Sequence, residues 1–239
     1  MIAGLGTMGW FHLGYFGLLI PASAVRSKKK LLGTADQPAP LSSRMAHFQR
    51  TAATLILFTG LSLLTAWRER MTLFPHSLPP LTAVIAGLAM YAITVAFMRP
   101  RWRRAVETRK RVVHLFMPDN ATERVWWIVV ALLAGVGEEI TWRGVQASLT
   151  SSLAGNVWIA AVITSISFAF AHYVQGWRSV AVIFVMALGF HTLVWFAGSL
   201  YVAMAVHVAY DITAGLSYGR LGRELGYGRD GCPPEPSKI

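Results

Sequence analysis

The sequence predicts an all-α polytopic membrane protein with about seven transmembrane helices. The chain of 239 residues is 54% hydrophobic and only 14% charged, which leaves too little polar surface for a soluble domain of this size. Its apolar residues fall into blocks of about 17–22, the length that a helix needs to cross roughly 30 Å of hydrocarbon. Its net charge of +11 comes from basic residues beside these blocks. Juxtamembrane charges are placed in this way, so we expect no nucleic-acid partner.

The transmembrane helices are expected near residues 3–24, 51–67, 79–98, 125–148, 155–173, 179–197 and 199–216. The first helix could be taken for a signal peptide, because Ala22-Ser23-Ala24 resembles a cleavage site. However, basic residues follow this apolar stretch and none precedes it, which reverses the charge order of a signal peptide. We therefore interpret the stretch as a retained helix.

Lysine and arginine are unevenly distributed over the predicted loops. The segment 25–50 holds six and the segment 99–124 holds eight, whereas the loop after the second helix holds only Arg68 and Arg70. The positive-inside rule then places the N-terminus outside the cell and the C-terminus in the cytoplasm. We expect the membrane to be a bacterial cell membrane. The segment 99–124 fits either an interfacial amphipathic helix ending at Pro118-Asp119 or a basic topology anchor.

We divide the chain into three parts. Residues 1–124 hold N-terminal membrane helices and basic cytoplasmic loops, residues 125–216 form a helical core, and residues 217–239 form a polar tail that we expect to be disordered. The single cysteine, Cys232, lies in the tail and excludes an intrachain disulfide.

Ionisable residues at membrane depth are the main functional signal. Each costs about 2.5–3.5 kcal/mol on insertion scales, so such residues usually face a wet cavity or a helix partner and mark a functional site. We assign to the predicted spans the acids Glu138, Glu139 and Asp211 and the histidines His172, His191 and His207. We therefore expect the last four helices to be the working half.

The spacing of these residues predicts local pairs. Glu139 and Arg143 lie four apart on one helix face and can form an ion pair. His207 and Asp211 are also four apart, so a carboxylate could orient an imidazole. Glu138 lies about 100° around the helix from Glu139 and needs another partner. The small residues just before it allow a neighbouring helix to approach closely.

A carboxylate and two histidines in a partly dry cavity can carry out hydrolysis. The glutamate can act as a general base toward water. The histidines can hold the water, donate to a developing oxyanion or protonate a leaving amine. The same side chains could instead bind a divalent metal such as zinc, as two histidines and a carboxylate do in many hydrolases.

Three motifs on separate apolar helices carry a resemblance to a known family. They are Glu138-Glu139-x-x-x-Arg143, Phe168-x-x-x-His172 and His207-x-x-x-Asp211. Together, over residues 125–215, they resemble the CPBP family, which comprises CAAX prenyl endopeptidases, bacterial Abi proteins and bacteriocin-processing or immunity proteins. The resemblance implies an intramembrane endopeptidase of the glutamate type, a hydrolase of peptide bonds. It also makes eight spans possible, because the CAAX enzymes have eight.

The resemblance implies a role for each motif residue. Glu138 would activate water and His172 would help to position it, while His207 and residue 211 would stabilise the oxyanion. Glu139 and Arg143 would support them, with a substrate contact open to Arg143. No cofactor is implied. The metal alternative has Glu138, His172, His207 and Asp211 as ligands.

Asp211 departs from the family pattern, because the CAAX enzymes carry Asn in this motif. An ionised Asp cannot donate a hydrogen bond to an oxyanion. Asp211 is therefore protonated, orients His207, or favours the metal alternative.

Other readings stay open. The glutamates could form a structural ion-pair network, and a single histidine could make an interhelical hydrogen bond, which is how we interpret His191. The same charges could serve a non-catalytic immunity or scaffold protein, or a proton-coupled transporter. For the protease, the expected partners are membrane lipid and a membrane-associated or lipidated peptide.

Overall fold

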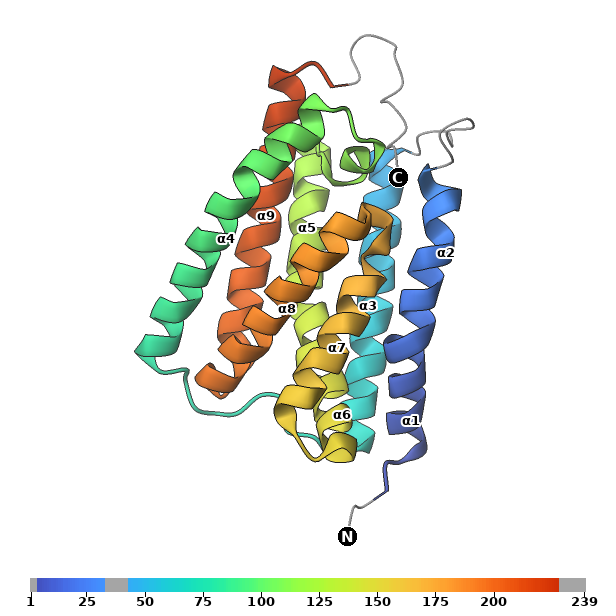
Figure 1. Cartoon of the computed structure of the whole chain (residues 1–239), viewed down its shortest axis with the longest axis vertical. Coiled ribbons are helices and arrows are strands. Elements are labelled where there is room, and N and C mark those ends of the chain that lie inside the picture. Colours follow the sequence, from blue (N-terminus) through green and yellow to red (C-terminus); the bar gives the residue numbers. More distant parts are fainter. Residues whose placement is uncertain (1–3, 33–42, 228–239) are drawn as a thin grey trace.

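The computed structural model describes residues 4–32 and 43–227, which are helical and contain no strand. In chain order the elements are α1 (Thr7–Gly14), η1 (Tyr15–Leu19), α2 (Ile20–Leu32), α3 (Arg44–Arg68), α4 (Leu81–Glu107), η2 (Arg111–Phe116), α5 (Ala121–Glu138), η3 (Glu139–Gln146), α6 (Ala147–Ala154), α7 (Val157–Ala171), η4 (Tyr173–Gln175), α8 (Trp177–Ala197) and α9 (Tyr201–Glu224). α1, η1 and α2 form one continuous rod, and α5, η3 and α6 form another (Figure 1). The predicted all-α class is confirmed.

The long helical segments correspond in order to the predicted membrane helices. Within the described residues, five stretches are long and apolar enough to cross a membrane, namely Thr7–Lys28, Arg44–Arg68, Leu81–Glu107, Ala121–Ala154 and Trp177–Ala197. α7 is apolar but shorter, and α9 has the length of a span but is more polar. α9 also runs eight residues beyond its expected end at 216, so the start of the expected tail is helical. Residues 228–239, with Cys232, lie outside the described residues.

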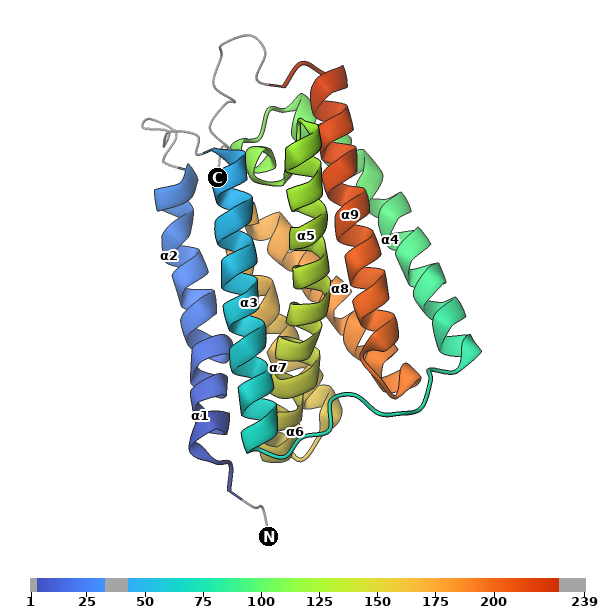
Figure 2. The same cartoon turned by 180° about the vertical axis from the view of Figure 1, so that it is seen from behind.

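α5 lies at the centre of the bundle, between α3 and α9, and α4 packs on the other side of α9 (Figure 2). Close approach depends on the small residues at the end of α5. A Cβ on Gly135 would lie 2.6 Å from the backbone nitrogen of Val208 on α9, and one on Gly137 would collide with Thr59 on α3. Only glycine allows both contacts, which confirms the expectation of close helix approach.

One end of the bundle collects the basic segments, and we call it the basic end. It holds the start of α3, the end of α4, η2, the start of α5 and the end of α9 (Figure 1). Here Arg44 pairs with Glu123 at 3.0 Å and with Asp119 at 3.4 Å. Burial raises the pKa of Tyr227 to about 12, so its hydroxyl stays protonated and donates to the Lys110 carbonyl at 2.9 Å.

The segment 99–124 does not form the separate interfacial helix that was one expectation. Its first part continues α4 through Pro100 to Glu107, and the rest is the short 3-10 helix η2 and the turn before α5. Because α4 simply extends past the apolar stretch, its basic residues lie at the end of a membrane helix rather than along a second one. This arrangement agrees with the other expectation, a basic anchor.

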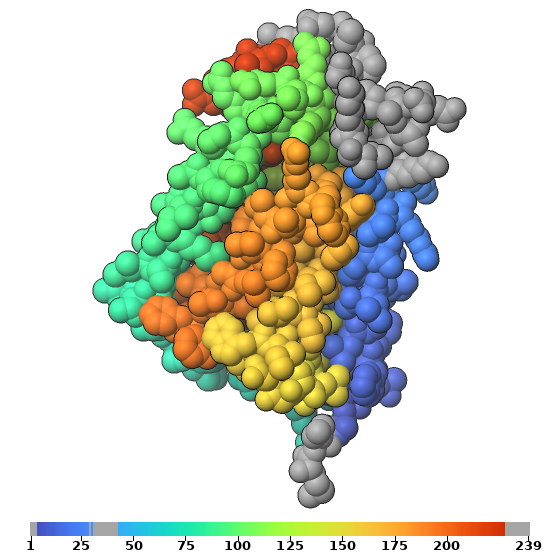
Figure 3. Space-filling model, in the orientation of Figure 1, coloured from blue at the N-terminus to red at the C-terminus, as the bar shows by residue number. Residues whose placement is uncertain are grey.

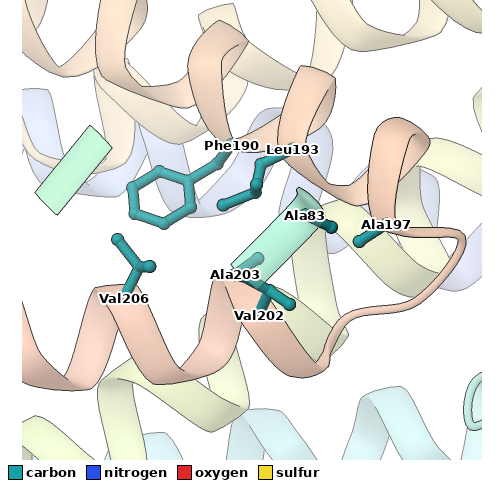
Figure 4. Packing of buried hydrophobic residues seen from close by; sticks show 7 residues of the cluster. All are labelled: Ala83, Phe190, Leu193, Ala197, Val202, Ala203 and Val206. Atoms are coloured by element: carbon teal, nitrogen blue, oxygen red, sulfur yellow. The ribbon is translucent and has the colours of Figure 1, made fainter. Parts of the chain in front are cut away.

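The opposite end of the bundle is closed by an apolar cluster that joins α4, α8 and α9. The cluster comprises Ala83, Phe190, Leu193, Ala197, Val202, Ala203 and Val206 (Figure 4). From this contact α4 and α8 diverge toward the basic end (Figure 1). In the space-filling view, atoms of α9 are visible at depth between them (Figure 3).

The short α7 sets the depth of the turn that follows it. Asn156 caps its start by accepting from the backbone N–H groups of Trp158 and Ile159, and the helix ends at Ala171. Its 15 residues cover about 22 Å, less than a bilayer core. The chain then turns through η4 and Gly176, whose φ of 94° suits glycine, into α8. This turn lies deeper in the bundle than the basic ends of α5 and α9 (Figure 1).

Candidate active site

Glu138 and two histidines converge from three different helices. Glu138 ends α5, His172 follows the last residue of α7, and His207 lies within α9. Oε2 of Glu138 lies 3.9 Å from Nε2 of His172 and 3.9 Å from Nε2 of His207. The structure therefore brings together the three residues to which the motif resemblance assigns water activation and oxyanion stabilisation.

The convergence depends on helix lengths that the sequence prediction had wrong. The predicted span boundaries place His172 nearer the basic end than Glu138, so the two meet only if the fourth helix enters the bilayer later or the fifth runs longer. Because α7 is short, its C-terminal turn reaches only partway along α5 and brings His172 level with Glu138. The side chains of Glu138 and His172 are 15% and 24% exposed, so this pair is not sealed from solvent.

His172 is held by its own helix. Its Nδ1 donates to the carbonyl of Phe168, four residues earlier, at 2.8 Å. A carbonyl can only accept, so in the neutral ring Nε2 carries the lone pair, and Nε2 is the atom facing Glu138. The Phe168 ring packs against the imidazole with centroids 4.6 Å apart. Phe168 is buried, as expected for a packing residue.

His207 is oriented by Glu139. Its Nδ1 lies 2.8 Å from Oε1 of Glu139, a short contact in which the carboxylate accepts the hydrogen. Nε2 of the same ring points toward Glu138 and toward Oδ2 of Asp211, at 3.9 Å and 3.6 Å. The pair expected from spacing, His207 with Asp211, is thus present but longer than the contact with Glu139.

Glu139 and Arg143 form the predicted ion pair. Oε1 of Glu139 lies 3.2 Å from Nη1 of Arg143, and both side chains are almost completely buried. The guanidinium also stacks over the ring of Phe168 at 4.2 Å and lies 5.3 Å from the ring of Phe190. Arg143 is therefore buried between the Glu139 carboxylate and two aromatic rings.

Asp211 is fixed through its backbone. The indole Nε1 of Trp127 on α5 donates to the carbonyl of Asp211 at 2.9 Å, and Gly215 leaves room for that indole. Trp127 is 7% exposed. The side chain of Trp127 thus lies inside the bundle and holds α9 at the site, and not at the membrane surface, where tryptophans near helix ends usually lie.

The distances around Glu138 suit a bridging water. Oε2 of Glu138 lies 3.9 Å from Nε2 of each histidine, and Nε2 of His207 lies 3.6 Å from Oδ2 of Asp211. These distances are too long for direct hydrogen bonds, but a water can bridge atoms at such separations. Among the described residues, no three His, Cys, Asp or Glu side chains are grouped so that they could hold a metal ion.

A cavity of about 400 Å³ lies beside this centre rather than in it. It is lined by residues of η3, α6, α7 and α8, including Arg143 and His191, but not by Glu138, His172 or His207. His191 lies 2.9 Å from Oγ1 of Thr164, an interhelical contact of the kind expected for it. We locate the site by the converging polar groups, because the cavity shares only Arg143 with them.

Two features of the site region escaped the sequence prediction. The chain passes from α-helix to the π-helix η3 directly after Glu138, and every residue of η3 is buried. π-Helical turns are frequent at functional sites. His12 on α1 is also buried, against the expectation that the polar residues at membrane depth lie only in the last four helices. It contacts Gln146 at the end of η3.

The fold and the site define a polytopic helical membrane protein with a glutamate–histidine centre between its helices. Residues 120–213 match a protein-family model described as type II CAAX prenyl endopeptidase Rce1-like, and all six predicted site residues lie in this segment. The predicted resemblance to the CPBP family is confirmed over this segment. The match supports a membrane protease of the CAAX kind. Comparisons with curated proteins and with solved structures found no match.

Proposed function

We propose that the chain is an intramembrane endopeptidase that hydrolyses a peptide bond of a membrane-associated or lipidated protein. The observation that carries this proposal is the position of Glu138, whose carboxylate faces the ring nitrogens of two histidines at 3.9 Å. A base of this kind must reach a water and a peptide carbonyl at the same time. The partly exposed Glu138 and the gap between the three side chains allow this.

The chemistry follows from the atoms that face the gap. Glu138 takes a proton from water while the lone pair on Nε2 of His172 holds the second hydrogen of that water. The water oxygen bonds to the peptide carbonyl carbon, and the carbonyl oxygen becomes an oxyanion. His207, with a hydrogen on each of its two ring nitrogens, donates to this oxyanion from Nε2. As the intermediate collapses, the C–N bond breaks and Glu138 returns its proton to the leaving amine. One water is consumed, and one carboxyl group and one amine are formed.

The remaining residues act through their neighbours. Glu139 orients His207 through Nδ1, and Arg143 balances the charge of Glu139 at 3.2 Å. Asp211 lies 3.6 Å from Nε2 of His207. We propose that its carboxyl group is protonated while the oxyanion forms, since an ionised carboxylate could not donate to the oxyanion and would compete with it for the single hydrogen on Nε2 of His207.

We propose that the site is reached from the cytoplasmic side. The basic end, which holds most of the Lys and Arg, would face the cytoplasm, with Thr7 near the outer surface. Membrane lipid would surround the bundle, and no cofactor would be required. The bacterial cell membrane remains our proposed location.

The test compares strains that carry wild type, Glu138→Gln or Asp211→Asn by peptidomics of membrane and medium. The amount of each variant in the membrane controls for folding, and Glu224→Gln at an exposed position provides a matched substitution. A membrane peptide that stays uncut only with Glu138→Gln supports the protease and identifies its substrate. If no peptide changes while a phenotype of the wild type persists in the variant, the charges serve an immunity, scaffold or proton-relay role and the protease proposal fails.

A further inference from the structure

The N-terminal helix reaches the site through a line of buried polar groups. Nδ1 of His12 lies 2.8 Å from the side-chain amide of Gln146, and Nε2 lies 3.2 Å from the hydroxyl of Ser62 on α3. That hydroxyl lies 2.9 Å from Thr141, which donates to the carbonyl of Gly137 at 2.7 Å. This line of polar groups thus contacts η3 at two points, Thr141 near Glu139 and Gln146 at the end of η3.

The geometry points to His12 as a positioning residue for the site, acting through η3 on Glu139 and then His207. Thr141 lies two residues after Glu139 in η3. The hydrogen bonds of its hydroxyl group therefore fix the helical turn that carries the Glu139 carboxylate. Glu139 in turn holds Nδ1 of His207 at 2.8 Å. A turn displaced by even 1 Å would misplace the reacting groups, and such displacements can cost about 100-fold in rate.

The hydrogens along this line can be counted. The Gly137 carbonyl only accepts, so the Thr141 hydroxyl uses its hydrogen there and must accept from Ser62. The single hydrogen of Ser62 is then used, so His12 donates to Ser62 from Nε2. A neutral ring then carries its lone pair on Nδ1, so Gln146 must turn its amide nitrogen toward Nδ1, the reverse of the orientation in which Oε1 lies 2.8 Å from Nδ1. The line therefore has one direction, from His12 to η3.

Neighbouring contacts keep His12 at this depth. The backbone N–H groups of Gly6 and Gly9 donate to the carboxylate of Glu69 at the end of α3, at 3.1 Å and 2.8 Å. One turn after His12, the carbonyl of Phe16 accepts from Ser167 of α7 at 2.9 Å. α1 is thus held to α3 and α7 above and below His12, although it lies outside the segment matched by the family model.

The test measures ring ¹⁵N resonances of the full-length chain in lipid nanodiscs with labelled histidine. Ser62→Ala breaks the line, whereas Ser165→Ala removes an equally buried hydroxyl that has no hydrogen-bond partner among the described residues. We expect the His207 resonances to shift in Ser62→Ala and to keep their wild-type positions in Ser165→Ala. We also expect His12 to show a hydrogen on Nε2. Unchanged His207 resonances in Ser62→Ala, equal shifts in both variants, or a His12 Nε2 without hydrogen would overturn the inference.

A second pair of variants decides the question if Ser62→Ala does not fold. In His12→Gln the side-chain amide nitrogen can take the place of Nε2 and still donate to Ser62, whereas the shorter His12→Asn can replace only Nδ1. Positioning through Ser62 predicts wild-type His207 resonances in His12→Gln and shifted ones in His12→Asn. The reverse order, or the same spectrum in both, would contradict it.

The kinetic readout rests on the proposed protease function, and the spectra do not. With a cleavable peptide found by the Glu138→Gln comparison, Ser62→Ala should lower kcat about tenfold and leave KM near the wild-type value. If Glu138→Gln abolishes no cleavage, the protease proposal fails while the resonance comparison still tests the positioning role.

Discussion

Nδ1 of His207 lies 2.8 Å from Oε1 of Glu139, and this contact turns the opposite nitrogen of the ring toward Glu138. Two consecutive glutamates therefore face one imidazole from its two sides. Glu139 is fully buried and paired with Arg143, whereas Glu138 is partly exposed. The environments differ although the residues are neighbours, so we expect substitutions at the two positions to have different consequences.

Replacing Glu138 should remove catalysis and leave the fold intact. In Glu138→Gln no carboxylate accepts the proton of water, and general-base contributions are typically about 100- to 10,000-fold. We expect a fall in cleavage rate of that size with the purified variant and a melting temperature close to that of wild type. Glu224→Gln serves as the control. Cleavage that survives in Glu138→Gln would assign the base to another group.

Replacing Glu139 should instead destabilise the protein. Glu139→Gln leaves the buried Arg143 guanidinium without its counter-charge, and breaking a buried pair in this way costs about 3–5 kcal/mol. The double variant Glu139→Gln/Arg143→Met removes both charges and should recover part of that loss. Thermal unfolding in detergent measures both. A double variant that is no more stable than Glu139→Gln would show that the cost does not arise from the unpaired guanidinium.

Close packing of α5 on α9 makes Gly135 sensitive to the smallest side chain. The methyl group of Gly135→Ala would meet Val208 and push the helices apart, and overpacking of this kind costs about 1–3 kcal/mol. Gly60→Ala on α3 adds the same methyl group where no atom lies within 4 Å, and it should be tolerated. Thermal unfolding of the two variants provides the comparison. Equal stability of the two would argue against helix contact at Gly135.

At position 211 we expect the amide to work as well as the acid. Asp211→Asn keeps the backbone carbonyl that accepts from Trp127 and adds an N–H donor near the proposed oxyanion. Its cleavage rate should stay within about tenfold of wild type, whereas Asp211→Leu should lose about 100- to 1,000-fold, as expected on losing an oxyanion donor. Rates with the same peptide decide the matter. Similar rates for Asn and Leu would exclude a hydrogen-bonding role for this side chain.

Chelation provides a test between the two proposed mechanisms. We expect the purified protein to cleave at an unchanged rate after prolonged treatment with a chelator, because in the proposed mechanism Glu138 and His172 activate water without a metal ion. A loss of activity that added Zn²⁺ restores would favour the alternative with Glu138, His172, His207 and Asp211 as ligands. Inductively coupled plasma mass spectrometry of the purified chain gives an independent readout.

Much of the site was predictable because membrane burial makes ionisable residues conspicuous. The cost of inserting Glu138, Glu139 and Asp211 marks them at once, and four-residue spacing predicts the Glu139–Arg143 pair. The contact between Glu139 and His207 was not predictable in this way, since it joins two helices and depends on their relative rotation. The π-helical geometry of η3 likewise has no local sequence signal that we recognise.

Other differences had signals that were overlooked. His12 lies in an apolar helix and carries the same insertion cost as the later histidines, so the same rule would have marked it. The start and end of α7 follow from Asn156 as a cap and Gly176 as a turn residue, and both are visible in the sequence. The inward position of Trp127 has no such signal, because tryptophans near helix ends usually lie at the membrane surface.

The length of α7 determines the position of the candidate site along the bundle axis. His172 follows its last residue, so the number of turns between Asn156 and His172 sets the position of the imidazole along the bundle. In the proposed protease this position would set how far below the headgroups a peptide bond must lie to be cut. One added turn would move that imidazole by about 5.4 Å, well beyond the reach of Glu138. For the proposed protease we therefore expect a substrate to be selected first by the depth at which it presents an extended segment, before any side chain is recognised.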